Sequence, residues 1–258
     1  MMRYIRLIKY LSNWWLHFAV KIGLTNKDPL IFRTLIDIIV EVPQRIMHEF
    51  KEIFMEGSYM RGLELKIPDR PVIIDVGANA GFFTFFAASQ FPGAQIYAYE
   101  PIGNNFEQLK RNKALNPTAR VLCFQKAVYG YSGEVTLNYD LRDSFTTSAS
   151  VYHSSDTLME TIQVPCVTLQ EIFNKHQVDR CHLLKMDCEG SEYEILYNCP
   201  STYIHRVDQM AIEVHGGKDV NQNITTLADY LNSLNFNTRQ YSEHMLWAWS
   251  QPRWLTIV

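Results

Sequence analysis

Five ionisable side chains that could move a proton stand at or just beyond two apolar segments, 181–186 and 209–214. These side chains are Lys185, Asp187, Glu189, Glu213 and His215. An imidazole titrates near neutral pH, so we take His215 as the first choice for a general base and Asp187 as the second. Both apolar segments read as buried strands, and open α/β sheets bind ligands at the carboxyl ends of their strands.

Other roles for the same side chains stay open. Each could have a structural or capping role, and Glu189 and Glu192 would complement the dipole at the start of the helix expected after residue 190. Asp187, Glu213 and His215 could also converge on a metal ion. The sequence alone gives no long-range geometry for such a cluster, and our prediction is that no metal is bound.

A second stretch with chemical character is IIDVGANAGFFTFFA, residues 73–87. Its apolar, β-branched beginning predicts a buried parallel strand that ends at Asp75. Gly77 and Gly81 can adopt positive φ, and Asn79 is one of the few other residues that tolerate the left-handed region. A helix after Gly81 would point free N–H groups at a molecule lying over the turn. The stretch therefore predicts a turn that binds a nucleotide-like ligand.

Glu100 follows the next predicted strand, 95–99. A carboxylate at this place can accept hydrogen bonds from both hydroxyls of a ribose. NAD-dependent enzymes use the same arrangement, so Glu100 supports an adenosyl ligand without choosing between cofactors.

Strands and helices alternate from residue 71 onward, which predicts an α/β fold with a mostly parallel sheet and helices on both faces. Further strands are expected at 71–76, 120–125, 181–186 and 209–214, with helices at 105–114, 167–176, 191–197 and 224–234. Residues 134–139 predict an added hairpin strand, and 237–241 with 245–258 a closing antiparallel pair. The polar segment 140–161 is either a loop on the acceptor side or a solvated insertion.

Composition limits the class of protein. The chain has 258 residues, 47% of them hydrophobic, which suits one domain with an extension. A net charge of −3 argues against nucleic acid as the main partner. Five cysteines without a CxxC pair fit a reducing compartment, so we expect a cytoplasmic protein.

The N-terminal part, residues 1–62, is expected to be a helical extension of the domain at 63–258, with helices within 1–24, 30–40 and 45–55. In residues 1–24, basic side chains alternate with Ile, Leu and Trp. Such a helix could pack on the domain, pack on a second copy in a homo-oligomer, or lie on a membrane surface as a peripheral anchor.

Several motifs together carry a family resemblance. The turn after Asp75 is similar to the acidic-x-G-x-G-x-G turn of S-adenosylmethionine (SAM) methyltransferases, with Asn79 in place of the middle glycine. With YAYEP, VPCVTLQEIF and LLKMDCEGSEYEIL, residues 71–216 resemble the FkbM family of SAM-dependent methyltransferases. Gln170 departs from the family, which often has an acidic residue there.

The resemblance implies a class I, Rossmann-like sheet of seven strands with the last antiparallel, SAM as cofactor, and methylation of a hydroxyl oxygen. The acceptor would be a small molecule, glycan or lipid-linked glycan. By position, Asp75, Gly77, Asn79 and Gly81 would form the SAM turn, Glu100 would hold the ribose, Lys126 and Ala127 would lie at the adenine edge, and Asp187 would face the methionine end. An acidic Asp75 suits the cationic end of SAM.

Two other functions compete with this one. A NAD-dependent oxidoreductase is disfavoured because the turn lacks GxGxxG. A non-catalytic scaffold in a glycan-assembly complex would keep the cofactor turn but would not need the ionisable residues that follow 181–186 and 209–214.

Overall fold

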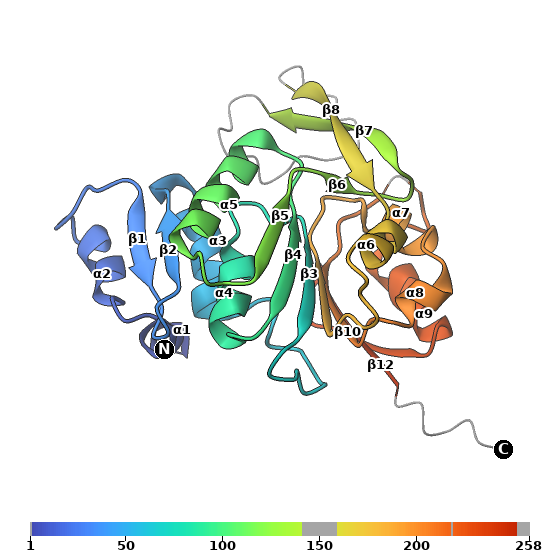
Figure 1. The fold of residues 1–258 in the computed structure, drawn as a ribbon, viewed down its shortest axis with the longest axis horizontal. Helices are drawn as coiled ribbons and strands as arrows, with labels where there is room; N and C mark the ends of the chain where they lie inside the picture. The colour runs from blue at the N-terminus through green and yellow to red at the C-terminus, as the bar shows by residue number, and fades with distance from the viewer. Residues whose placement is uncertain (1, 141–158, 218, 252–258) are drawn as a thin grey trace.

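Seven strands form the central sheet of the computed structural model, which describes residues 2–140, 159–217 and 219–251 (Figure 1). In spatial order these strands are β11 (Phe236–Gln240), β12 (Met245–Ser250), β10 (Gln209–Glu213), β9 (Leu183–Met186), β3 (Val72–Val76), β4 (Gln95–Tyr99) and β5 (Val121–Phe124). Six of these strands run in the same direction, and β12 runs in the opposite direction. The predicted mostly parallel sheet with an antiparallel last strand is confirmed.

The strands are buried on both faces because successive side chains point to opposite sides. Ile73 and Ile96 belong to one apolar cluster, whereas their neighbours Ile74 and Tyr97 belong to another. The helices that supply these clusters are α4 (Phe82–Gln90), α5 (Gly103–Leu115), α6 (Leu169–Lys175), α7 (Glu192–Tyr197), α8 (Ser201–Ile204) and α9 (Ile224–Ser233). Helices cover both faces, as expected. The helices predicted from residue 71 onward match within a few residues, and the short α8 was not predicted.

The N-terminal part contains strands as well as helices. Its elements are α1 (Met2–Tyr10), α2 (Trp15–Lys21), β1 (Leu30–Arg33), β2 (Ile39–Val42), the 3₁₀ turn η1 (Gln44–Ile46), α3 (Met47–Lys51) and the π-helical turn η2 (Glu52–Glu56). The helix predicted over 30–40 is therefore wrong, because β1 and β2 form an antiparallel hairpin. Its turn uses Asp37 at φ 62° and the Thr34 hydroxyl, which accepts the Ile38 N–H at 3.0 Å.

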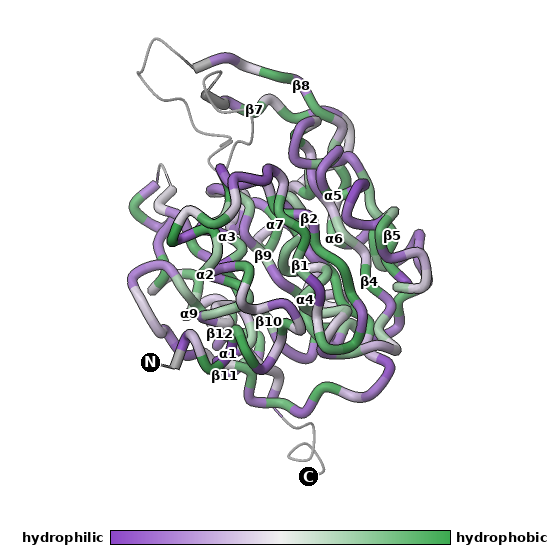
Figure 2. Tube along the Cα trace, turned by 90° about the vertical axis from the view of Figure 1, so that its left-hand side faces the viewer, coloured by the Kyte–Doolittle hydropathy of each residue, from purple (hydrophilic) through white to green (hydrophobic). Residues whose placement is uncertain are grey.

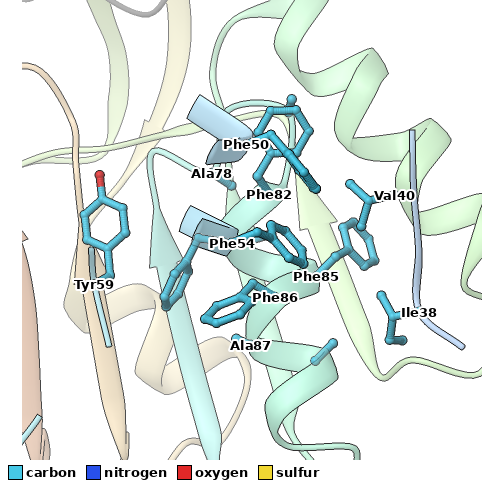
Figure 3. Packing of buried hydrophobic residues seen from close by; sticks show 14 of the residues in the cluster. Ile38, Val40, Phe50, Phe54, Tyr59, Ala78, Phe82, Phe85, Phe86 and Ala87 are labelled. Carbon is cyan, nitrogen blue, oxygen red and sulfur yellow. The ribbon is translucent and has the colours of Figure 1, made fainter. Parts of the chain in front are cut away.

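This N-terminal part shares one apolar core with α4 (Figure 3). The rings of Phe50 and Phe54 stack at 4.5 Å and meet Phe82 and Phe86 edge-on, at 5.8 and 5.0 Å. Residues 1–24 form two short helices rather than one. No helix within the described ranges is long and apolar enough to cross a membrane. The boundary placed between 62 and 63 stays a prediction.

A small second sheet lies beyond the carboxyl ends of the central strands (Figure 1). It consists of β6 (Ala127–Val128), β8 (Met159–Val167) and β7 (Gly133–Asp140), and β7 and β8 pair antiparallel. The hairpin strand predicted at 134–139 is confirmed. Most of the segment predicted as a loop, 140–161, lies outside the described residues, but its last residues belong to β8.

Candidate active site

The turn after β3 has the backbone geometry that its residue types predict. Gly77, Asn79 and Gly81 all have positive φ, of 73°, 49° and 85°. A Cβ atom on Gly77 would lie 1.7 Å from the backbone oxygen of Asp187. Only glycine therefore lets β3 and the residue after β9 approach each other here.

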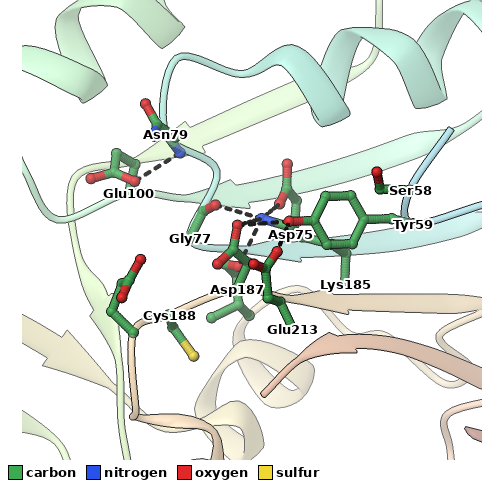
Figure 4. A network of polar contacts seen from close by, with 12 residues as sticks. Ser58, Tyr59, Asp75, Gly77, Asn79, Glu100, Lys185, Asp187, Cys188 and Glu213 are labelled. Carbon is green, nitrogen blue, oxygen red and sulfur yellow. Dashed lines mark hydrogen bonds and ion pairs between the residues drawn. The ribbon is translucent and has the colours of Figure 1, made fainter. Parts of the chain in front are cut away.

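Glu100 is buried at the end of β4 and is fixed by two backbone donors. Its Oε2 accepts the Asn79 N–H at 2.8 Å (Figure 4). Its Oε1 accepts the Ile102 N–H, also at 2.8 Å. Burial raises the pKa of this carboxyl group to about 7, although the two N–H groups act in the opposite direction. Each carboxylate oxygen has a second lone pair, so Glu100 can still accept ribose hydroxyls, and the site fits an adenosyl cofactor.

A cavity opens between Glu100 and the small sheet. Its lining includes Gly77, Asn79, Glu100, Ala127, Leu137, Asp187, Glu189 and Ser191. We call it the cofactor-side cavity. Ala127 thus lines the cofactor-side cavity, and its place at the adenine edge stays a prediction, whereas Lys126 lines a neighbouring hollow with Glu171 and Lys175. The structure does not bring Lys126 to the cofactor-side cavity.

Asp75 lies beneath the turn instead of on a cavity wall. Its side chain is fully buried, with Oδ1 3.3 Å from Nζ of Lys185 and Oδ2 accepting the Thr84 hydroxyl. Lys185 also donates to the Gly77 carbonyl at 2.6 Å. Burial lowers the pKa of Lys185, but the nearby carboxylates of Asp75 and Asp187 outweigh this and raise it, so the ammonium stays charged. That Asp75 faces the cationic end of SAM stays a prediction; in this structure it anchors Lys185.

A second cavity, of about 220 Å³, adjoins the first. We call it the acceptor-side cavity. The two cavities share Gly77, Asn79, Asp187 and Glu189. The lining of the second also includes His48, Glu49, Glu52, Tyr59, Lys185 and Glu213. The ends of β9 and β10 therefore meet at one place, as expected, and α3 and η2 close it from the other side.

Tyr59, Glu49 and Glu52 are residues of this cavity that the sequence did not reveal. The Tyr59 hydroxyl lies 2.8 Å from Oδ2 of Asp187 and 2.6 Å from Oε2 of Glu213. Burial raises the pKa of Glu49 to about 8, and the charge of Asp187 adds to this. Helical periodicity places Glu49 and Glu52 on one face, three residues apart, but nothing in the sequence indicates which face meets the site.

His215 is held between two carboxylates. Its Nδ1 lies 3.0 Å from Oε1 of Glu192, and its Nε2 lies 3.5 Å from Oε2 of Glu189. Burial lowers its pKa, but the hydrogen bond and charge of Glu192 and the charge of Glu189 raise it to about 9. His215 is not among the residues lining either cavity, whereas Asp187 and Glu189 line both. Glu192 begins α7, as expected, and also fixes the imidazole.

Ligand atoms of Asp187, Glu213 and His215 lie within 4.8 Å of one another. The alternative metal cluster thus has suitable spacing. All three groups already have protein partners, namely Tyr59 for the two carboxylates and Glu192 for the imidazole.

The strand order and the glycine turn after β3 are those of a class I methyltransferase, a fold that uses SAM. The family described as Methyltransferase FkbM domain matches residues 75–240, and the chain belongs to this family. This confirms the resemblance seen in the motifs and the SAM-dependent methyltransferase class, in preference to a NAD-dependent oxidoreductase.

Two curated relatives and one solved structure illustrate the family at low sequence identity. The chain is 28% identical over 193 residues to 31-O-demethyl-FK506 methyltransferase FkbM of Streptomyces tacrolimicus, covering 64% of this chain and 73% of that protein. It is 23% identical over 164 residues to hexuronic acid methyltransferase AglP of Haloferax volcanii, covering 64% of each. The solved structure of methyltransferase FkbM from Methylobacillus flagellatus has the same fold, with a TM-score of 0.51 and 16% identity over 80% of this chain and 54% of that one.

Proposed function

We propose that this methyltransferase transfers the methyl group of SAM to a hydroxyl oxygen. One observation carries the proposal: Asp187 lines both the cofactor-side and the acceptor-side cavity. A group able to accept a proton thus lies where donor and acceptor would meet. When bound, SAM supplies an electrophilic methyl group on a sulfonium, and the protein must hold the acceptor oxygen in line behind it.

An alcohol is almost entirely protonated at neutral pH, so its oxygen needs a base. In our proposal His215 takes this proton, with Glu192 holding Nδ1 and thereby leaving Nε2 directed toward Glu189. Because His215 itself lines neither cavity, the proton would pass from the acceptor hydroxyl to the carboxylate of Glu189, which lines both, and from there to Nε2 of His215, 3.5 Å away. Asp187 is the second choice for the base. Glu213 and Lys185 line the acceptor-side cavity and would hold the acceptor and Asp187 in place.

The acceptor we propose is a neutral, hydroxyl-rich sugar, glycan, lipid-linked glycan or natural product. Glu49, Glu52 and Glu213 line the acceptor-side cavity and offer acceptors for several hydroxyl groups. The names of two relatives, one an O-demethyl-FK506 methyltransferase and one a hexuronic acid methyltransferase, agree with oxygen acceptors. The five unpaired cysteines support a cytoplasmic location.

The test is a transfer assay with full-length protein, SAM carrying a labelled methyl group, and pairs of acceptors that differ only in carrying a hydroxyl or an amine. We expect the label on the hydroxyl member, seen by mass spectrometry of the product. Asp187→Asn should reduce transfer, and Asp179→Asn, at an exposed aspartate, should not. Transfer only to amines or carbon would overturn the proposal.

A further inference from the structure

Exposed apolar side chains are concentrated in the N-terminal part. Nine of the sixteen large apolar side chains that are exposed in the described residues lie between positions 5 and 36. They include Trp15, 57% exposed, and Leu24, 75% exposed, together with Ile5, Ile8, Ile22 and Leu35. Their elements form one end of the molecule in Figure 1 and face the viewer in Figure 2. A patch of this kind indicates a contact surface.

The same part carries positive charge in an acidic protein. Residues 1–37 contain six basic and two acidic side chains, a formal charge of +4, while the whole chain carries −3. The remaining residues therefore carry −7, from −3 minus +4. This charge asymmetry fits an anionic partner. The same asymmetry argues against a second copy of the chain as the partner, because two equally charged surfaces would repel each other.

A cavity of about 260 Å³ lies among α1, α2 and α3, next to these exposed residues. Three cations from three different elements line it: Arg3, Lys21 and Lys51. Glu56 is the carboxylate among its lining residues, and Met47 and Met55 add apolar wall. Neither Lys21 nor Lys51 forms an ion pair with a carboxylate within the part of the chain that the structure describes. The cavity exceeds the roughly 30 Å³ that a water molecule occupies and can admit a phosphate group.

All three cations act electrostatically on one buried side chain, His17. Burial lowers the pKa of His17, and Lys51, Lys21 and Arg3 lower it further. A phosphate in the cavity would neutralise this positive charge and accept hydrogen bonds from the three side chains.

The segment formed by α3 and η2 connects this cavity to the active site. We call the cavity lined by Arg3, Lys21 and Lys51 the basic cavity. Met47, Lys51 and Met55 recur every four residues and line it. Glu49, Glu52 and Ile53 line the acceptor-side cavity instead. Two flanks of one short helical segment therefore line two different cavities.

We propose that residues 2–36, with Lys51, form a docking surface for an anionic lipid bilayer. The basic cavity receives the phosphate of a lipid headgroup, while the exposed apolar side chains enter the interfacial layer, as in other interfacial helices. The inference goes beyond the proposed function and does not depend on which acceptor is methylated.

The test is co-sedimentation of the full-length protein with vesicles of phosphatidylcholine alone and of phosphatidylcholine mixed with phosphatidylglycerol. We expect binding to the anionic vesicles that is roughly tenfold stronger than to the neutral ones and that weakens with added salt. Lys21→Glu with Lys51→Glu, and separately Trp15→Ser with Leu24→Ser, should each reduce binding about tenfold. Lys66→Glu with Arg120→Glu, at exposed sites outside this surface, is the matched control and should reduce vesicle binding less.

Circular dichroism and the unfolding temperature identify any variant that fails to fold, and the second pair of substitutions then decides. Equal binding to both vesicle types, or binding unchanged in both pairs, would overturn the proposal. Protection from unfolding by glycerol phosphate without vesicle binding would assign the cavity to a soluble phosphate compound instead. A dimer in light scattering that Trp15→Ser with Leu24→Ser dissociates, without vesicle binding, would assign the surface to a second copy.

Discussion

The hydroxyl oxygen of Tyr59 lies 2.6 Å from Oε2 of Glu213, which links the segment before the sheet to the end of β10. The same oxygen lies 2.8 Å from Oδ2 of Asp187. One phenol has one proton to donate, so it can satisfy only one of the two carboxylates. Burial and the charge of Asp187 both raise the pKa of Glu213, and a protonated Glu213 would donate the second hydrogen bond.

Tyr59→Phe should reduce the free energy of unfolding by about 1–3 kcal/mol at a pH of about 8, because two partly buried carboxylates lose their shared donor. The pKa of Glu213 is raised in the folded state, so its charge destabilises the fold above that pKa and disappears as the pH falls through it. The loss should therefore be smaller at a pH of about 5.5. Urea unfolding at both pH values measures this, with Tyr131→Phe, at an exposed tyrosine, as the control. An equal loss at both pH values would contradict the charge argument.

Gly77→Ala should prevent cofactor binding and destabilise the fold. Its φ of 73° is unfavourable for alanine, and the added Cβ would lie 1.7 Å from the Asp187 backbone oxygen. Strain at such a position costs about 1–3 kcal/mol before the clash is counted. Thermal unfolding and calorimetry with S-adenosylhomocysteine measure both effects. The control is Gly216→Ala, whose new Cβ would meet nothing within 4 Å. Normal binding by Gly77→Ala would show that β3 and the residue after β9 can separate freely.

Cofactor affinity should increase with pH through Glu100. The pKa of its carboxyl group is about 7, and the ionised form is the one that accepts two ribose hydroxyls. If only that form binds, the dissociation constant should fall about tenfold between a pH of about 6 and about 8. Calorimetry with S-adenosylhomocysteine should show this for the wild type and for Glu107→Gln, an exposed control. Glu100→Gln should bind more weakly at every pH and without this dependence, and retained dependence would assign it to another group.

The cofactor turn and the sheet could be predicted because their signals are local. The β-branched run before Asp75 and the residues that tolerate positive φ specify a strand and a turn within a few positions. The hairpin at 30–42 could not be distinguished from a helix, since its apolar residues fit both periods.

The rest of the site depends on contacts between distant residues. Tyr59 is 128 positions from Asp187 and 154 from Glu213, and no local pattern marks it as their partner. Lys185 lines the acceptor-side cavity, but its ion pair with Asp75 under the turn could not be predicted, because the two residues are far apart in the sequence. The sequence predicts that His215 lies at a strand end. The hydrogen bond between His215 and Glu192, which raises the pKa of His215, depends on how α7 packs and could not be predicted.

Removing divalent metal should leave activity unchanged. A metal at Asp187, Glu213 and His215 would compete with the Tyr59 hydroxyl for the two carboxylates and would lie near the Lys185 ammonium, which is 3.6 Å from Asp187. We therefore expect the same transfer rate with and without EDTA, and no change in unfolding temperature on adding Mg²⁺, Mn²⁺ or Zn²⁺. Loss of activity in EDTA that a divalent ion restores would establish the metal cluster instead.

The pH dependence of transfer distinguishes His215 from the two carboxylates, Glu189 and Asp187, as the general base. The pKa of His215 is about 9, so the neutral imidazole that can accept a proton becomes more abundant as the pH rises to that value. With His215 as base, kcat/KM should rise up to a pH of about 9, and His215→Gln should lower kcat by roughly 10²–10⁴-fold with unchanged affinity for S-adenosylhomocysteine.

Glu192→Gln is a second variant that tests whether His215 is the base. It keeps the size of the side chain that holds Nδ1 but removes the charge that raises the pKa of His215, so the rising limb of the profile should move to lower pH. The pKa of Glu189 is about 7, raised first by burial. A profile that is already flat above a pH of about 7, in both the wild type and His215→Gln, would therefore assign the base to Glu189 or Asp187 and leave the imidazole a positioning role.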